Sequence, residues 1–499
     1  MTLSRLLKRA AALVLFAIPS LAAQIPDTLV ERLADSESNV RRKAVLELAK
    51  HSGTDAVELM LKALADPSPR VADTAQWELP SMLSTDSIKL LTGKQGSGSK
   101  QTLVRLRAVE ALGRIEFDFD SSWAIAAIKS KDSRTRAATL WSLERLLRNR
   151  RLKSGLGKKT LAQVKKRLKD KSGLVRGAAL SVLDAAGPGL TFMELTKHVE
   201  KRNPPAQRAA AVQIACRDNQ DDSKRLLVLS GLLDDDLSVR TCAVEAIGQN
   251  PDRGLVTTLA LQLEIEQSLR LRWTIVRVLR ELSGRKYGIN PQSWQNWTHS
   301  LEEDWKKPKK QAQGNFDSGE STSSFAGLRV LSKRVCILID FSGSIWKNGK
   351  NGTTRKAAVD IELRKALESL PKDAMFNLIP YTGKPMPWKD KLVRADKGNI
   401  RRAMEWFEKL NAVGQGNFWD ALQLALEDQD VDTIIALTDG APSGGERWDL
   451  KLMGPLLAER NRFKRVVLDA ILVDSPSFLV SMWRDMCAES GGRVVEIDL

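Results

Sequence analysis

A pattern that recurs about every 32 residues constrains the first half of this chain more than any other feature. Its clearest copies read "DSESNVRRKAVLEL", "DPSPRVADTAQWEL", "DKSGLVRGAALSVL" and "DDDLSVRTCAVEAI". In each copy Val follows Asp by five residues, Ala follows Val by four, and an aliphatic residue follows Ala by four. Equivalent positions fall at 41, 72, 105, 136, 176, 208, 240 and 272, separated by 31 to 33 residues except for one gap of 40. A fixed period of this length indicates a solenoid of repeated units.

Each unit reads as a pair of amphipathic helices. In the fifth unit Leu161, Val164 and Leu168 share one helical face, and a second apolar face follows the turn at Asp170. One pair cannot bury its apolar stripe alone, so successive pairs must stack. The motif V-R-x-x-A-x-x-x-L after an Asp-bearing turn resembles short bacterial (PBS-lyase-like) HEAT repeats. The resemblance implies an all-α solenoid of about eight pairs over residues 27–285, with a scaffold role and no lyase activity.

Two shorter segments follow the repeats. In residues 286–305, Trp294, Trp297 and Trp305 have helical spacing, which favours a cap over the last repeat. Residues 306–327 are poor in apolar residues and contain Pro, Gly and a serine-rich tract, which predicts a flexible linker.

Residues 328–499 have a different pattern, in which short apolar runs alternate with amphipathic stretches. The runs "VCILID", "MFNLIPY", "DTIIALTDG", "VVLDAILVD" and "RVVEIDL" predict strands buried on both faces, and the stretches between them predict helices. This alternation indicates a doubly wound, mostly parallel sheet, in which ligands bind beyond the carboxyl ends of the strands. Asp340 and Asp439 both fall at such ends.

Three motifs at these strand ends carry a second resemblance. The segments Asp340-x-Ser342-x-Ser344, "GQGNFWDAL" from Gly414, and "LTDG" from Leu437 resemble the loops of a von Willebrand factor type A domain. In that family the three loops build a metal-ion-dependent adhesion site. The resemblance covers residues 328–499 and implies that this domain binds a divalent cation.

The resemblance also implies roles for single residues. Ser342 and Ser344 would bind the ion directly through neutral hydroxyls, while Asp340 and Asp439 would act through bound water. Mg²⁺ is the expected ion, with Ca²⁺ and Mn²⁺ as alternatives, since all three prefer oxygen ligands. An ion with so few carboxylate ligands keeps positive charge and can accept a carboxylate from a partner protein.

One departure from the family pattern bears on this site. The family's middle loop usually reads Gly-Gly-Thr-Asn with the threonine as a ligand, whereas this chain has Gly416 at the threonine position. Asn417 is a weak substitute candidate; otherwise water or Gln415 fills the position, the affinity falls, or the ion is lost. A competing interpretation is that the two serines only cap the helix after the first strand.

The residues available argue against an enzyme. Residues 328–499 contain no histidine, so a Ser-His-Asp triad cannot form within this domain, and "FSGS" is not the G-x-S-x-G nucleophile motif. No Cys or His cluster has zinc-site spacing. The four cysteines, Cys216, Cys242, Cys336 and Cys487, are too few for a disulfide framework in a chain of 499 residues, although the first two could meet.

The N-terminus and the charge suggest location and partners. A basic start, an apolar run from Ala10 to Ile18 and the small residues around Ala22 and Ala23 predict a signal peptide over residues 1–23. We therefore expect an exported, bacterial-type protein, periplasmic, secreted or on the cell surface, with no transmembrane segment in the mature chain. Of the net charge of +17, +15 lies before residue 328, which favours an anionic surface or polymer at the solenoid. Specific nucleic-acid binding is disfavoured, because no aromatic residues alternate with the basic ones.

The sequence thus predicts a multidomain chain, an all-α HEAT-like solenoid followed by a doubly wound α/β domain. Its expected function is that of a non-enzymatic scaffold whose metal-ion-dependent adhesion site binds an acidic residue of a protein partner. Two alternatives remain open: a metal-independent scaffold with a degenerate site, and an accessory subunit of a chelatase- or ATPase-like enzyme complex.

Overall fold

The computed structural model describes residues 25–152, 154–218, 221–308, 323–348, 352 and 354–497. The predicted signal peptide and most of the predicted linker lie outside these residues. Among the described residues, no helix is both long enough and apolar enough to cross a membrane.

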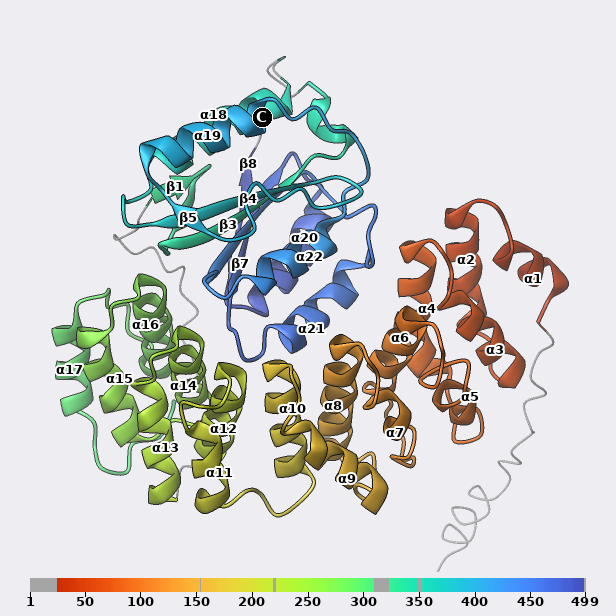
Figure 1. Cartoon of the computed structure of the whole chain (residues 1–499), viewed down its shortest axis with the longest axis horizontal. Helices are drawn as coiled ribbons and strands as arrows, with labels where there is room; N and C mark the ends of the chain where they lie inside the picture. The colour runs from red at the N-terminus through yellow and green to blue at the C-terminus, as the bar shows by residue number, and fades with distance from the viewer. Residues whose placement is uncertain are drawn as a thin grey trace, which may run out of the picture.

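The first half forms the predicted solenoid, in which helices pair in chain order and the second helices of successive pairs stack on one another (Figure 1). The pairs are α1 (Asp27–Leu33) with α2 (Ser38–Leu48), α3 (Thr54–Ala63) with α4 (Pro69–Met82), α5 (Ile88–Thr92) with α6 (Thr102–Leu112), α7 (Ala124–Ala127) with α8 (Ser133–Arg148), α9 (Lys158–Arg167) with α10 (Gly173–Ala185), α11 (Phe192–Val199) with α12 (Pro205–Arg217), α13 (Asp222–Leu232) with α14 (Leu237–Gln249), and α15 (Arg253–Ile265) with α16 (Leu269–Ser283). The repeated Ala of the motif, such as Ala179 and Ala243, is fully buried and allows neighbouring helices to approach closely.

The repeated arginine and acidic residue of the motif form a ladder along the solenoid. In each rung the guanidinium makes two hydrogen bonds of 2.7–3.0 Å to one carboxylate in the turn of the next repeat. It also donates to a backbone carbonyl in the turn that precedes its own helix. The rungs are Arg41–Asp66, Arg136–Asp170, Arg208–Asp234 and Arg240–Glu266. Such two-point pairs fix orientation as well as distance, so the ladder sets the angle between repeats.

The last pair is followed by α17 (Pro291–His299), which packs against α15. Trp294 and Trp297 are buried in the core of the last repeats, and Trp305 packs at the edge of that core. Their rings meet edge to face, with centroids 6.0 Å apart for the first pair and 6.3 Å for Trp297 and Trp305. All four cysteines are buried and free, so Cys216 and Cys242 are not bonded.

The C-terminal half contains the predicted doubly wound sheet. Its strands are β3 (Arg334–Asp340), β4 (Met375–Tyr381), β5 (Val393–Arg394), β6 (Thr433–Thr438), β7 (Val467–Val473) and β8 (Val494–Ile497), in the spatial order β5-β4-β3-β6-β7-β8. All neighbours are parallel except β5, which runs antiparallel to β4. The chain runs outward from β3 to β5 and then returns to β6, so the switch point lies between β3 and β6.

Helices cover both faces of this sheet. The helices α18 (Arg355–Glu368) and α19 (Lys397–Glu408) pack on one face, and α20 (Phe418–Glu427), α21 (Leu450–Arg460) and α22 (Ser477–Ala488) on the other. A short hairpin, β1 (Ser323–Phe325) and β2 (Leu328–Val330), adds Phe325 to the core on the α18 side. The predicted linker boundary at residue 328 therefore falls inside a folded hairpin.

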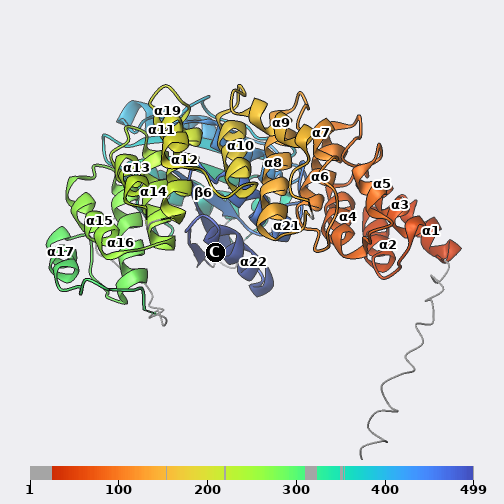
Figure 2. The same cartoon turned by 90° about the horizontal axis from the view of Figure 1, so that it is seen from below.

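The two halves are in direct contact. The solenoid curves around the α/β domain, which lies on its concave side with α21 nearest to the solenoid (Figure 1). The view from below shows the same arc from α1 to α17, with the domain behind its middle (Figure 2). The second helices of the pairs supply the contacts, including α4, α6, α8, α10 and α16. Phe463 of the α/β domain is 2% exposed and belongs to the apolar core of the solenoid.

Candidate metal site

The first loop of the candidate site follows β3. Asp340 ends the strand, is 6% exposed, and accepts hydrogen bonds from the Ser342 amide and from the Thr438 hydroxyl, both at 2.8 Å. Ser342 precedes the short 3₁₀ helix η2 (Gly343–Trp346), yet its side chain makes no capping hydrogen bond. The hydroxyl oxygens of Ser342 and Ser344 instead lie 2.9 Å apart. The two serine hydroxyls therefore contact each other, and the Ser342 hydroxyl does not cap the helix. This weakens the capping interpretation.

Asp340 has an unusual electrostatic environment. Burial, with a smaller contribution from the charge of Asp439, raises the pKa of Asp340 to about 6, although the hydrogen bonds from Ser342 and Thr438 oppose the shift. A nearby positive charge favours the ionised form of such a carboxyl group. The position is thus one where a cation and a buried carboxylate would stabilise each other.

The second loop runs from Gly414 to Asn417. Gly414 forms a parallel bridge with Ser342, and a Cβ atom at Gly416 would lie 3.3 Å from the Asp340 carboxylate. The residue that replaces the family's threonine therefore borders the predicted site. Asn417 is used elsewhere: its Oδ1 accepts from the Asp420 amide as the N-cap of α20, and its Nδ2 donates to Gly383 O and to Asp420 Oδ2. With those bonds made, Asn417 is poorly placed to replace a ligand.

The third loop follows β6 and begins with Asp439. Its Oδ2 accepts a hydrogen bond of 2.9 Å from Arg355 Nη1 at the start of α18. The same guanidinium contacts the Asp474 carboxylate at 3.1 Å. The sequence predicted Asp439 as a site residue but gave no sign of Arg355, which supplies a positive charge of the chain's own beside the site.

The donor set is chemically suited to a hard divalent cation. The Asp340 carboxylate, which accepts from the Ser342 amide, and the paired hydroxyls of Ser342 and Ser344 lie in one loop at the carboxyl end of β3, beside the switch point. These three residues would hold Mg²⁺. Asp439 would contribute as well if its carboxylate contacted the ion and Arg355 together. The chemistry supplied by such an ion is the capture of a further oxygen ligand.

The second and third loops are interlocked. Ser443 Oγ accepts from the Gly416 amide at 2.7 Å, and the Ser443 amide donates to Gly416 O at 3.0 Å. Gly445 has a φ of +92°, and a Cβ atom there would overlap the side chain of Asn417. Only glycine suits such a conformation and such a close approach. The conformation of the loop at Gly416 is therefore tied to that of the loop after Asp439.

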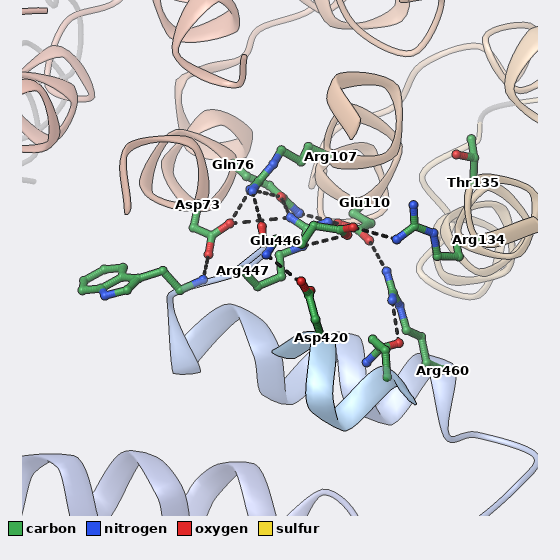
Figure 3. Close-up of polar contacts among 12 residues, drawn as sticks. Asp73, Gln76, Arg107, Glu110, Arg134, Thr135, Asp420, Glu446, Arg447 and Arg460 are labelled. Atoms are coloured by element: carbon green, nitrogen blue, oxygen red, sulfur yellow. Dashed lines mark hydrogen bonds and ion pairs between the residues drawn. The ribbon is translucent and has the colours of Figure 1, made fainter. Parts of the chain in front are cut away.

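The far end of the third loop packs against the solenoid helices (Figure 3). Arg447 has no exposed side-chain surface; its guanidinium pairs with Glu110 at 2.7 Å and bonds Gln76, with Asp73 at 3.7 Å. Arg107 donates to Glu446 O at 2.7 Å.

Solenoid side chains also hold the residues on either side of Arg447. Asp73 accepts from the backbone amides of Trp448 and Asp449, and Arg134 pairs with the Glu446 carboxylate at 2.7 Å. The ring of Trp448 lies under the guanidinium groups of Arg42 and Arg70, at 5.0 and 5.4 Å. Sequence reasoning missed this interface, because an arginine in a Gly-rich loop has the pattern of an exposed residue.

Comparisons with known proteins agree with the two architectures. Residues 26–94 match the family model for HEAT repeats. The chain is 35% identical over 131 residues to inter alpha-trypsin inhibitor, heavy chain 4, from Mus musculus, a match that covers 24% of this chain and 13% of that protein. It is 33% identical over 114 residues to von Willebrand factor A domain-containing protein 3A from Homo sapiens, covering 23% of this chain and 9% of that protein.

Among solved structures, a von Willebrand factor type A protein from Catenulispora acidiphila superposes with a TM-score of 0.29 at 21% identity, covering 34% of this chain and 40% of that one. The chain spans only a small part of the curated relatives' length. The fold and the strand-end loops define an α-solenoid joined to a doubly wound domain. The chain thus carries HEAT repeats in its solenoid, followed by a domain similar to von Willebrand factor type A domains, which is called the type A domain below.

Proposed function

We propose that this protein is an exported, non-enzymatic scaffold whose type A domain binds an acidic residue of a protein partner through a divalent cation. The observation that carries the proposal is the position of Asp340, Ser342 and Ser344. The Asp340 carboxylate and the paired serine hydroxyls lie at the carboxyl end of β3, beside the switch point of the sheet, and the Ser342 hydroxyl makes no capping hydrogen bond.

The role of each residue follows from its place. The two serine hydroxyls would bind the ion without neutralising it, and Asp340 would supply negative charge from a buried position. The Thr438 hydroxyl and the Ser342 amide orient the Asp340 carboxylate through hydrogen bonds of 2.8 Å. A cation left with net positive charge would favour a carboxylate ligand from a partner.

The solenoid offers only part of its surface to an outside partner. Its concave side holds the type A domain, so a protein or anionic polymer from outside would meet the other surfaces of the repeats (Figure 1). The basic excess before residue 328 supports an anionic partner there. An exported location is supported by the N-terminal segment alone.

Titration calorimetry of the whole chain with Mg²⁺ and Mn²⁺ tests the proposal. We expect binding with a stoichiometry of one, lost in Asp340→Ala and in Ser342→Ala, and kept in Ser300→Ala, a serine substitution far from the site. Binding of an Asp-containing peptide should require the ion. Equal heats for wild type and Asp340→Ala would contradict the proposal.

A metal-independent scaffold is the second candidate, and two observations favour it. Gly416 offers no side chain, and Arg355 already neutralises Asp439 at 2.9 Å. In that case the same loops would bind a partner without an ion, and chelator would leave partner binding unchanged.

A further inference from the structure

The loop from Asp439 to Asp449 connects the candidate metal site with the interior of the solenoid. Asp439 lies at the site end, Ser443 bonds the second loop at Gly416, and Arg447 is buried between helices α4 and α6. Only three residues separate Ser443 from Arg447. A segment this short, fixed at both ends, has few conformations. A change in the position of Arg447 should therefore also change the position of Ser443.

We propose that the solenoid is a positioning element of the metal site. The positioning residue is Arg447 of the type A domain, which Glu110, Gln76 and Asp73 of the solenoid hold in place. Docking of Arg447 sets the affinity of the site for its cation. The inference rests on the proposed metal-dependent function and adds to it the regulation of the site by the rest of the chain.

We call Arg447 and its partners Glu110, Gln76 and Asp73 the anchor of this loop, and the charges in it are buried and paired. Two acidic side chains of the solenoid, Asp73 and Glu110, face two guanidinium groups, Arg107 and Arg447, and all four are at most 2% exposed. Buried charges are stable only when they are paired and hydrogen-bonded. Withdrawal of Arg447 would leave the buried Glu110 carboxylate without its closest cation. The undocked state of the loop should therefore be much less stable than the docked state.

A second set of contacts connects the anchor with the candidate metal site. The Glu446 amide faces Asp420 Oδ1 at 3.4 Å, and Asp420 Oδ2 accepts from Asn417 Nδ2 at 2.7 Å. Asn417 follows Gly416, whose amide donates to Ser443 and where an added Cβ atom would lie 3.3 Å from the Asp340 carboxylate. The anchor thus reaches the site by two routes, one through Ser443 and one through Asp420. By linkage, a cation that favours this loop arrangement must also favour docking.

The test uses the full chain and Mn²⁺ as the probe. Glu110→Gln and Arg447→Met remove the anchor from its two sides, and Arg447→Lys keeps the charge without the two-point geometry. Arg462→Met is the matched control, because Arg462 pairs with Glu144 in the same interface but lies beyond α21 and outside the loop. We expect Mn²⁺ affinity to fall about tenfold in Glu110→Gln and Arg447→Met, less in Arg447→Lys, and less than twofold in the control.

Amide hydrogen exchange in metal-free protein gives a second measurement. We expect faster exchange in residues 414–417 and 439–449 of Glu110→Gln than of wild type, with no such change in Arg462→Met. If wild type binds no Mn²⁺, the proposed metal function fails, and exchange alone decides whether the anchor positions the loops. Unchanged affinity and exchange in both anchor variants, or equal losses in the control, would overturn the inference.

Discussion

Phe463 offers the clearest test of whether the two domains form one unit. It lies between α21 and β7 of the type A domain, is 2% exposed, and packs in the apolar core of the solenoid. Its ring lies against α10, where a Cβ atom added at Gly177 would come within 2.8 Å of Phe463 Cε2. A side chain from one domain that fills the core of the other should stabilise docking more than it stabilises its own domain.

The expected magnitude follows from the burial. Replacing a fully buried Phe by Ala costs about 3–5 kcal/mol, because apolar surface is lost and a cavity remains. Phe478→Ala is the matched control: it changes the same residue type in the same domain, but Phe478 is 65% exposed. An exposed position of this kind should change stability by less than about 0.5 kcal/mol.

Urea unfolding followed by tryptophan fluorescence, combined with small-angle scattering, measures both effects. We expect Phe463→Ala to lower the free energy of unfolding by the amount above, to separate the transitions of the two domains, and to increase the radius of gyration. Phe478→Ala should behave as wild type. Equal unfolding midpoints and equal scattering for the two variants would refute the assignment of Phe463 as an interdomain contact.

Changes at Glu459, Gly416 and Arg355 should alter stability or Mn²⁺ affinity in a stated direction. Burial and the nearby charge of Glu110 raise the pKa of Glu459 from its usual 4.5 to about 8. Because the folded state then holds a proton that the unfolded state loses, stability should decline as pH rises from about 4.5 to 8. Glu459→Gln should flatten this decline in thermal melts. Gly416→Thr should raise Mn²⁺ affinity in calorimetry by adding a hydroxyl beside Asp340, once the 3.3 Å contact with that carboxylate relaxes; an affinity no higher than that of wild type would show that the position contributes no ligand. Arg355→Gln should also strengthen Mn²⁺ binding, because it frees Asp439 from its 2.9 Å ion pair, and weaker binding would mean that Arg355 orients Asp439 for the ion.

The sequence predicted those parts of the fold that depend on local patterns. The recurring Asp, Val, Ala and aliphatic positions predicted the helix pairs, and the arginine ladder explains why the acidic residue and the arginine repeat together. Likewise, alternation of apolar runs and amphipathic stretches predicted the doubly wound sheet and placed Asp340 and Asp439 at strand ends. The two-residue strand β5 and the hairpin β1–β2 were missed, because such short strands carry too few residues for a period to show.

The docking of the domains could not be predicted from one sequence. Arg447 and Glu110 are 337 residues apart, and each has the local pattern of a solvated charge. Phe463 fits equally well into its own domain's apolar pattern. Arg355 is similar: its pairing with Asp439 depends on how the start of α18 meets the end of β6, which no local spacing reveals.

A crystal of the whole chain grown with Mn²⁺ tests directly whether a cation binds at the serine pair. We expect one anomalous scattering peak within ligand distance of the Ser342 and Ser344 hydroxyls, next to Asp340, with Arg447 still buried against the solenoid. A map in which ordered water alone occupies that position at saturating Mn²⁺ would contradict it.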